Sequence, residues 1–163
     1  MLTPIVALGV AALLLLVGWR AWLASKGVPK SLEELKGALE QLLEWGRSNG
    51  FLVITPIGSN AFIQFNKYML SATEAGLELS FPRAAWSRDY FSAVEQLCDG
   101  EAIEYRIEHR PDNHMEFLTI DCRDDIPLAH KLTAQILTRV FDIPGAGTGK
   151  RFRVLFYNIR VAD

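Results

Sequence analysis

Three glycines stand beside a lysine near the end of the chain, in the stretch DIPGAGTGKRF at residues 142–152. Glycine-rich loops can cradle a phosphate, because their backbone amides are free to point at the anion. A nucleotide-binding P-loop, however, places four residues between its first glycine and its Gly-Lys pair. Here three residues separate Gly145 from Gly149, and Arg151 stands where a P-loop has serine or threonine. We therefore expect a plain helix-to-strand connection and no bound nucleotide.

Histidines and glutamates around a predicted hairpin are the next candidates for chemistry. His109 and His114 flank its turn, but they lack the third and fourth ligands that a tetrahedral metal site needs. Glu104, Glu108 and Glu116 could share one face of the hairpin and act in acid–base catalysis. An arginine among them favours ordinary charge pairing on a solvated face. We predict no metal, no cofactor and no catalytic residue here.

The two cysteines do not favour nucleophilic catalysis. Cys122 alternates with apolar residues in a strand pattern, and Cys98 lies on the apolar side of a helix pattern. A thiol in a core is more often filler than a nucleophile. Two cysteines cannot build a disulfide framework, and free thiols are a simpler interpretation than one bridge. An enzyme therefore stays an alternative without named residues.

Length and charge limit the possible classes of protein. The chain has 163 residues, which suits one domain with an appendage, and its formal charge is −2. All 19 acidic side chains lie from Glu33 onward, whereas three of the 17 basic ones, Arg20, Lys26 and Lys30, precede them. A mildly acidic domain lacks the electrostatic footprint of a nucleic-acid binder, so we expect no nucleic acid as a partner.

An apolar segment opens the chain and is its clearest pattern. No charged residue occurs between Leu2 and Trp19, and a helix of this length can cross about 30 Å of hydrocarbon. Residues 1–25 are therefore predicted to be a transmembrane anchor. Indole rings and basic side chains mark its membrane-interface end, and these are Trp19, Arg20, Trp22 and Lys26.

A removable signal peptide is the main alternative to an anchor, and a helix buried in a core is another. No basic residue precedes Arg20, and the residues around Ala24 form a poor cleavage pattern. Basic side chains follow the span, so the N-terminus is predicted outside and the C-terminal domain in the cytoplasm. The lipid bilayer and a membrane protein are the partners that this location implies.

The rest of the chain divides into a short linker, residues 26–30, and one domain, residues 31–163. Ser31 and Glu34 have the spacing of a capping box and start a leucine-rich helix. Alternating apolar residues and turn signals then predict strands, with two further helices between them. The predicted helices are 31–50, 87–100 and 124–141, and the predicted strands are 51–55, 61–65, 76–81, 102–109, 115–122 and 150–159.

This order, α-βββ-α-ββ-α-β after the anchor, predicts an α+β fold with an antiparallel sheet covered by helices. The order is loosely similar to small secretion-chaperone-like folds. That likeness implies a module that binds a partner chain on an open sheet.

Aromatic and arginine residues supply the partner-binding candidates. Trp86 lies between Arg83 and Arg88 just before a helix, and such clusters are common at interface hot spots. The alternative is that Trp86 packs under the sheet and the arginines are solvated. Arg151 and Arg153 lie on the last strand, which we expect at a sheet edge that they guard against pairing or from which they face acidic lipid.

Three functions remain open from the sequence. The first is a single-pass accessory subunit or binding module that docks onto a membrane protein complex. The second is a chaperone- or immunity-like protein that binds one protein ligand through its sheet. The third is a membrane-tethered enzyme, for which no set of convergent polar residues is evident.

Overall fold

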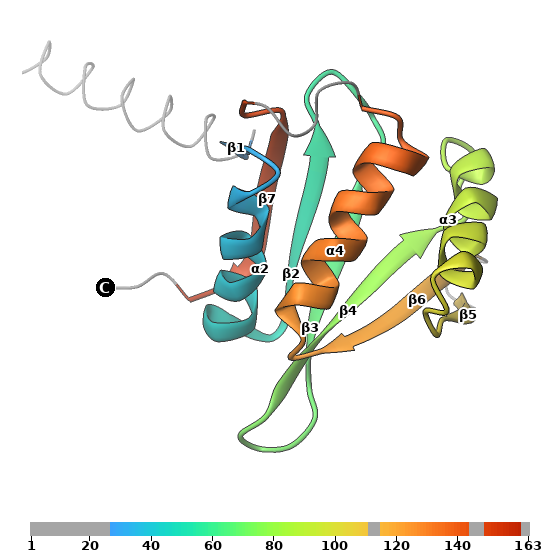
Figure 1. Ribbon diagram of the computed structural model, residues 1–163. Coiled ribbons are helices and arrows are strands. Elements are labelled where there is room, and N and C mark those ends of the chain that lie inside the picture. The colour runs from blue at the N-terminus through green and yellow to red at the C-terminus, as the bar shows by residue number, and fades with distance from the viewer. Residues whose placement is uncertain (1–26, 111–114, 144–148, 161–163) are drawn as a thin grey trace, which may run out of the picture.

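A computed structural model describes residues 27–110, 115–143 and 149–160 (Figure 1). They form one seven-stranded sheet with helices packed on one of its faces. The strand order is β1-β7-β2-β3-β4-β6-β5, and each pairing is antiparallel. The strands are β1 (Val28–Lys30), β2 (Gly46–Pro56), β3 (Ile63–Met69), β4 (Ala75–Pro82), β5 (Arg106–Arg110), β6 (Met115–Arg123) and β7 (Phe152–Ile159).

The helices begin at local signals that are visible in the sequence. The bounds are α2 (Glu34–Trp45), α3 (Arg88–Gly100) and α4 (Ile126–Gln135), and α4 continues into the π-helical turn η1 (Ile136–Val140). Ser31 and Glu34 make the reciprocal bonds of a capping box, at 2.7 and 3.3 Å. Asp125 caps α4 by accepting a 2.9 Å hydrogen bond from the amide of Leu128.

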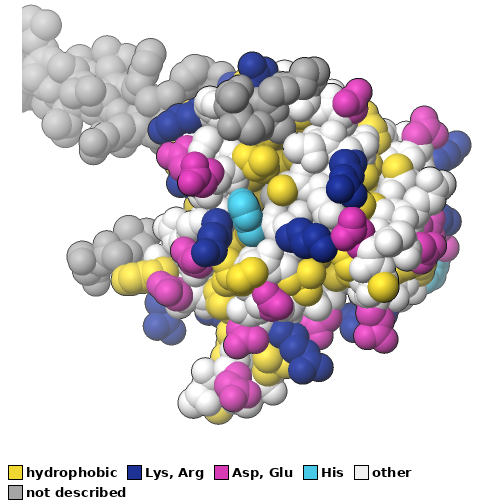
Figure 2. All heavy atoms as spheres, in the orientation of Figure 1, with side chains coloured by type: hydrophobic (Ala, Val, Ile, Leu, Met, Phe, Trp, Pro, Cys, Tyr) yellow, Lys and Arg dark blue, Asp and Glu magenta, His cyan; other side chains and the backbone are white. Residues whose placement is uncertain are grey.

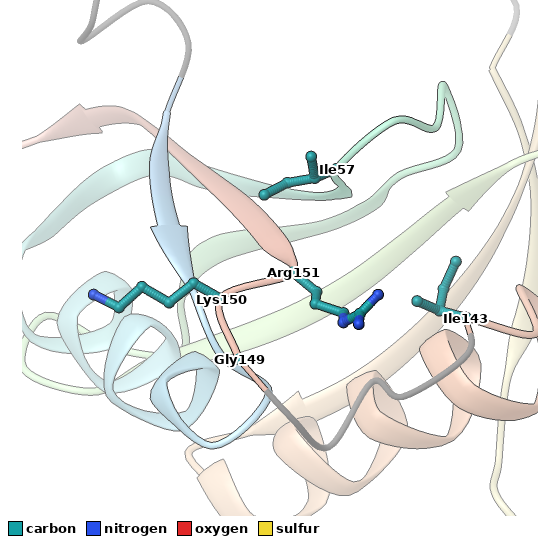
Figure 3. Close-up of a pocket in the computed structure, with 5 residues that line it drawn as sticks. All are labelled: Ile57, Ile143, Gly149, Lys150 and Arg151. Carbon is teal, nitrogen blue, oxygen red and sulfur yellow. The ribbon is translucent and has the colours of Figure 1, made fainter.

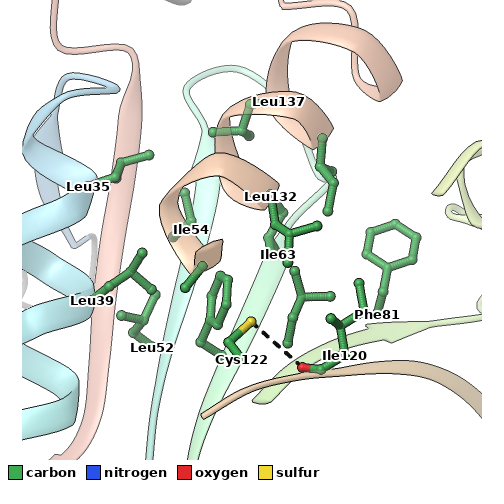
Figure 4. Packing of buried hydrophobic residues seen from close by; sticks show 14 of the residues in the cluster. Leu35, Leu39, Leu52, Ile54, Ile63, Phe81, Ile120, Cys122, Leu132 and Leu137 are labelled. Carbon is green, nitrogen blue, oxygen red and sulfur yellow. Dashed lines mark hydrogen bonds between the residues drawn. The ribbon is translucent and has the colours of Figure 1, made fainter. Parts of the chain in front are cut away.

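The core lies between the sheet and the helices (Figure 4). Leu35 and Leu39 of α2 and Leu132 of α4 are fully buried against strand residues such as Leu52 and Ile54. Strand residues alternate between this buried side and the opposite side, as the side-chain period of two requires. The alternation gives the sheet one face that packs on helices and one face over which the described residues place no helix.

The last strand is not at the sheet edge, so that sequence prediction is wrong. β7 lies between β1 and β2, with Val28 opposite Val154 and Ile54 opposite Val154 on the other side. β1 forms inside the segment that was predicted as a linker, and it takes the edge position instead. A three-residue strand containing a proline has too little periodicity to be recognised without its partner.

The predicted fold class also needs correction at the N-terminus. Among the described residues, no helix is long and apolar enough to cross a membrane. The longest α-helix, α3, has 13 residues, and α4 with η1 has 10 and 5, whereas a span takes about 20. The predicted anchor at residues 1–25 lies outside the described residues. The predicted single-pass location, with the N-terminus outside and the domain in the cytoplasm, depended on that helix and is corrected with it.

Candidate protein-binding face

The face of the sheet opposite the core has no described helix over it, and we call it the open face. The strand registers place its side chains in rows that run across the sheet. One row is Leu155, Val53, Gln64, Ser80, Thr119 and Arg106, and the next is Tyr157, Phe51, Asn66, Glu78 and Asp121. Both rows are apolar at β7 and β2. The first row continues through uncharged polar residues to Arg106 on β5, and the second becomes acidic at Glu78 on β4 and Asp121 on β6.

The apolar end of the open face is an aromatic patch, made of Phe51, Val53, Leu155 and Tyr157. The rings of Phe51 and Tyr157 stack with centroids 4.5 Å apart and planes at 12°. Tyr157 is 43% exposed, and the other three side chains are half-buried. The patch is therefore a partly exposed apolar surface on two paired strands, with a tyrosine at its most accessible point.

At the charged end of the open face, the charged side chains pair with one another. Arg106 on β5 donates to Glu78 at 2.9 Å and to Glu108 at 3.1 Å, and these carboxylates raise the pKa of the guanidinium. Beneath this layer, Ser80 and Thr119 are almost fully buried although they face away from the core. A partner would gain little here, because the charged groups already satisfy one another.

Tyr68 makes a further polar contact at the charged end of the open face. Its hydroxyl donates to Asp121 on β6 across the intervening strand β4. Gly76 permits this path, since a Cβ there would lie 2.7 Å from the Tyr68 ring. Burial, and then the bond to Asp121, raise the pKa of Tyr68 to about 12. The tyrosine therefore stays protonated and acts as a donor that ties three strands together.

The structure separates the partner-binding candidates that precede α3. Arg83 forms ion pairs with Glu116 at 2.6 Å and Glu95 at 3.8 Å, and its guanidinium lies 4.2 Å from the centroid of the Phe91 ring. Trp86 is half-buried, and its ring contacts those of two phenylalanines. Arg88 is exposed at the start of α3. Arg83 and Trp86 thus have clear packing roles, and only Arg88 is oriented fully towards solvent.

The two candidate arginines near β7 lie in different surroundings. Arg153 lies on the open face next to the aromatic patch, between Pro29 of β1 and Thr55 of β2. Arg151 precedes β7 and lines an open pocket of about 580 Å³ with Lys150, Gly149 and two isoleucines (Figure 3). Of the two, only Arg153 borders the open face.

The glycine-rich loop itself lies mainly outside the described residues, which omit 144–148. Next to it, Lys150 forms a 3.7 Å ion pair with Glu34 of α2. The interpretation of this loop as a connection without nucleotide stays a prediction. The predicted membrane-interface residues Trp19, Arg20, Trp22 and Lys26 also fall outside the described part.

The register of the β5–β6 hairpin does not bring the histidine and glutamate candidates together. His109 pairs with Glu116 and Glu108 pairs with Phe117, so the two glutamates point to opposite faces. His114 lies outside the described residues. Among the residues that the structure covers, no group of three His, Cys, Asp or Glu side chains could hold a metal ion.

Both cysteines are buried free thiols in the core. Burial raises the pKa of Cys98 to about 11 and that of Cys122 to about 12. Cys122 lies 3.9 Å from the carbonyl oxygen of Ile120, as the dashed line in Figure 4 marks. The nucleophile is the thiolate, so these pKa values make both side chains inert packing groups.

The helix-covered face differs from the open face in charge pattern. Figure 2 shows acidic and basic side chains interspersed over the face that α2 and α4 cover. Several of them pair, as Lys131 and Arg139 do with Glu101 at 2.9 and 3.1 Å. No large area of one sign appears on this side.

Comparisons with protein-family models, with curated proteins and with solved structures found no match to this chain.

Proposed function

We propose that this domain is a binding module that docks one protein partner on the aromatic patch of its open face. The observation that carries the proposal is the stacked pair Phe51 and Tyr157 on a face without a described helix. Tyrosine is enriched at interface hot spots, because its ring supplies a large contact area at low entropic cost. This function retains the sequence-based prediction that a partner binds on the sheet, but it does not include the predicted membrane location.

The surroundings of the patch suit the centre of an interface. A stable interface buries about 800 Å² on each partner, so contact must extend beyond four side chains. Gln64, Asn66 and Thr55 flank the patch in the strand registers and would form a neutral polar rim. Arg153 forms no ion pair with any described residue, and it lies at the border of the patch. The partner should therefore present an apolar side chain to the two rings and a carboxylate to Arg153.

Site-specific photo-crosslinking tests this proposal. Tyr157 is replaced by the photoreactive amino acid benzoylphenylalanine, and the matched control carries the same amino acid at Lys36 on the outer side of α2. We expect one discrete adduct with another protein from position 157 and none from position 36. Adding Arg153→Glu to the position-157 variant should reduce that adduct.

Two results would overturn the proposal. The first is an identical set of adducts, or no adduct, from both positions in cells that contain the native partners. The second is an adduct only with another copy of the chain, which would identify the open face as a self-association surface. Circular dichroism of both labelled variants verifies that they are folded.

A further inference from the structure

A second open pocket, of about 610 Å³, lies at the end of the sheet where α2 is followed directly by β2 (Figure 1). Three cationic side chains line it, namely Arg47, Lys67 and Arg160. They come from β2, from β3 and from the residue that follows β7. The backbone amide of Arg160 donates to the carbonyl of Trp45 at 2.9 Å, which holds the end of β7 against the end of α2.

A large bulge in β2 presents two of the lining residues. Residues 47–50 of β2 stand opposite Asn158 of β7 alone, whereas regular pairing matches one residue with one. Bulges re-aim side chains out of the regular ladder and are frequent next to binding sites. Here the bulge carries Arg47 and Ser48, both of which line the pocket. A Cβ at Gly50 would lie 3.0 Å from the carbonyl oxygen of Asn158, so a larger residue there would crowd the bulge.

Lys67 is the buried cation of the pocket. It is 8% exposed, and its ammonium donates to the carbonyl of Leu43 in the last turn of α2. A Cβ at Gly46 would lie 3.1 Å from Cδ of Lys67, so the glycine leaves room for the lysine stem. An ammonium has three donors, and Leu43 uses one of them. Burial, and then the charge of Arg160, lower the pKa of Lys67, and an anion in the pocket would oppose both effects.

The cations outnumber the carboxylates in the lining of this pocket. Within residues 27–110, 115–143 and 149–160, none of the three forms an ion pair with Asp or Glu. Glu44 also lines the pocket, but its carboxylate accepts a 3.2 Å hydrogen bond from the indole of Trp45. Seven other lysines and arginines among the described residues have a carboxylate partner. Within this part of the chain Arg153 has none either, but it lies on the open face, whereas these three cations line one pocket.

We propose that this pocket binds the phosphate group of a phosphomonoester. A phosphate dianion has enough oxygens to accept from two guanidinium groups, one ammonium and the hydroxyl of Ser48 together, whereas a carboxylate has only two. The three cations and Glu44 give the lining a net charge of +2, which matches the −2 charge of the dianion. The volume is larger than one phosphate needs, which leaves room for the organic group that carries it.

Calorimetric titration of the folded chain with phosphoserine, inorganic phosphate and acetate tests the proposal. We expect saturable binding of phosphoserine with a dissociation constant of about 1 mM or tighter, weaker binding of inorganic phosphate, and the weakest response to acetate. Arg47→Gln and Arg160→Gln should each weaken phosphoserine binding by about tenfold, since each removes a charged donor. Lys67→Met should abolish it.

Arg88→Gln is the matched control, because it removes an exposed arginine outside the pocket and makes the same change in net charge. Its affinity for phosphoserine should equal that of the unmodified chain. Equal losses in Arg47→Gln and Arg88→Gln would show a general charge effect and overturn the proposal. Equal affinities for acetate and phosphoserine, or no heat of binding from phosphoserine, would also overturn the proposal. Since Lys67→Met removes a buried contact, the two exposed arginine variants decide the outcome if that variant does not fold.

Discussion

The ring of Tyr157 stacks on the ring of Phe51 across the β7–β2 pairing, on the side of the sheet that faces away from the core. Two aromatic rings in that position do not contribute to the main hydrophobic cluster. They stabilise the strand pairing locally and leave one tyrosine ring accessible. A structural contact and a candidate binding surface therefore share the same two side chains.

The stacking energy can be measured separately from any binding role. A double-mutant cycle with Phe51→Ala and Tyr157→Ala should give a coupling free energy of about 0.5–1.5 kcal/mol, the range for aromatic pairs. Urea unfolding of the four proteins supplies the values. A coupling near zero would show that the rings are independent in solution.

Gly76→Ala should destabilise the domain by about 1–3 kcal/mol, the usual cost of overpacking. The new methyl group would lie 2.7 Å from the ring of Tyr68 and would push its hydroxyl away from Asp121. Gly37→Ala is the control, because nothing lies within 4 Å of a Cβ there. Gly37 is an exposed residue in the first turn of α2, so that change should stabilise the domain, by up to about 1 kcal/mol, in the same urea assay. Equal effects of the two substitutions would contradict the packing described for Tyr68.

The bond from Tyr68 to Asp121 predicts a change in stability at alkaline pH. The folded pKa of Tyr68 is about 12, above its ordinary value of 10.0, so the folded state holds this proton more tightly. The stabilisation is complete below pH 10 and is lost as the pH rises towards 12. The free energy of unfolding should therefore fall more steeply across this range in the unmodified chain than in Tyr68→Phe. Parallel curves would show that the hydroxyl is not held in this way in solution.

The buried thiols should resist alkylation. Because burial raises the pKa of Cys98 to about 11 and that of Cys122 to about 12, iodoacetamide at neutral pH should label neither cysteine in the folded chain. Both should react once urea unfolds the protein, and mass spectrometry counts the added groups. Rapid labelling of either thiol without urea would show that its part of the core opens readily.

Individual helices could be predicted because their signals are local. The capping box of Ser31 and Glu34 and the leucine spacing through Leu35, Leu39 and Leu42 are contained in a dozen neighbouring residues. The same predicted helix ends five residues early, at Trp45, because Gly46 starts β2. That boundary depends on pairing with the end of β7, which is more than 100 residues away in the chain.

The aromatic patch was missed, although a signal for it exists. Phe152, Val154 and Phe156 alternate along the last strand and point to one face of it. Leu155 and Tyr157 point to the opposite face, so apolar side chains occupy both faces of β7. A strand that is apolar on both faces suggests contacts on both sides. The neighbour of this second face, Phe51 on β2, became evident only with the register.

The sequence alone located three helices and six of the seven described strands, because hydrophobic period and capping depend on residues a few positions apart. The tertiary structure decided that β7 lies inside the sheet, that Phe51 meets Tyr157, and that Arg47, Lys67 and Arg160 line one pocket. These relationships depend on strand order and register, which are set by the packing of segments far apart in the chain. One β-bulge or one unrecognised edge strand changes which side chains become neighbours, while the local pattern of each segment stays the same.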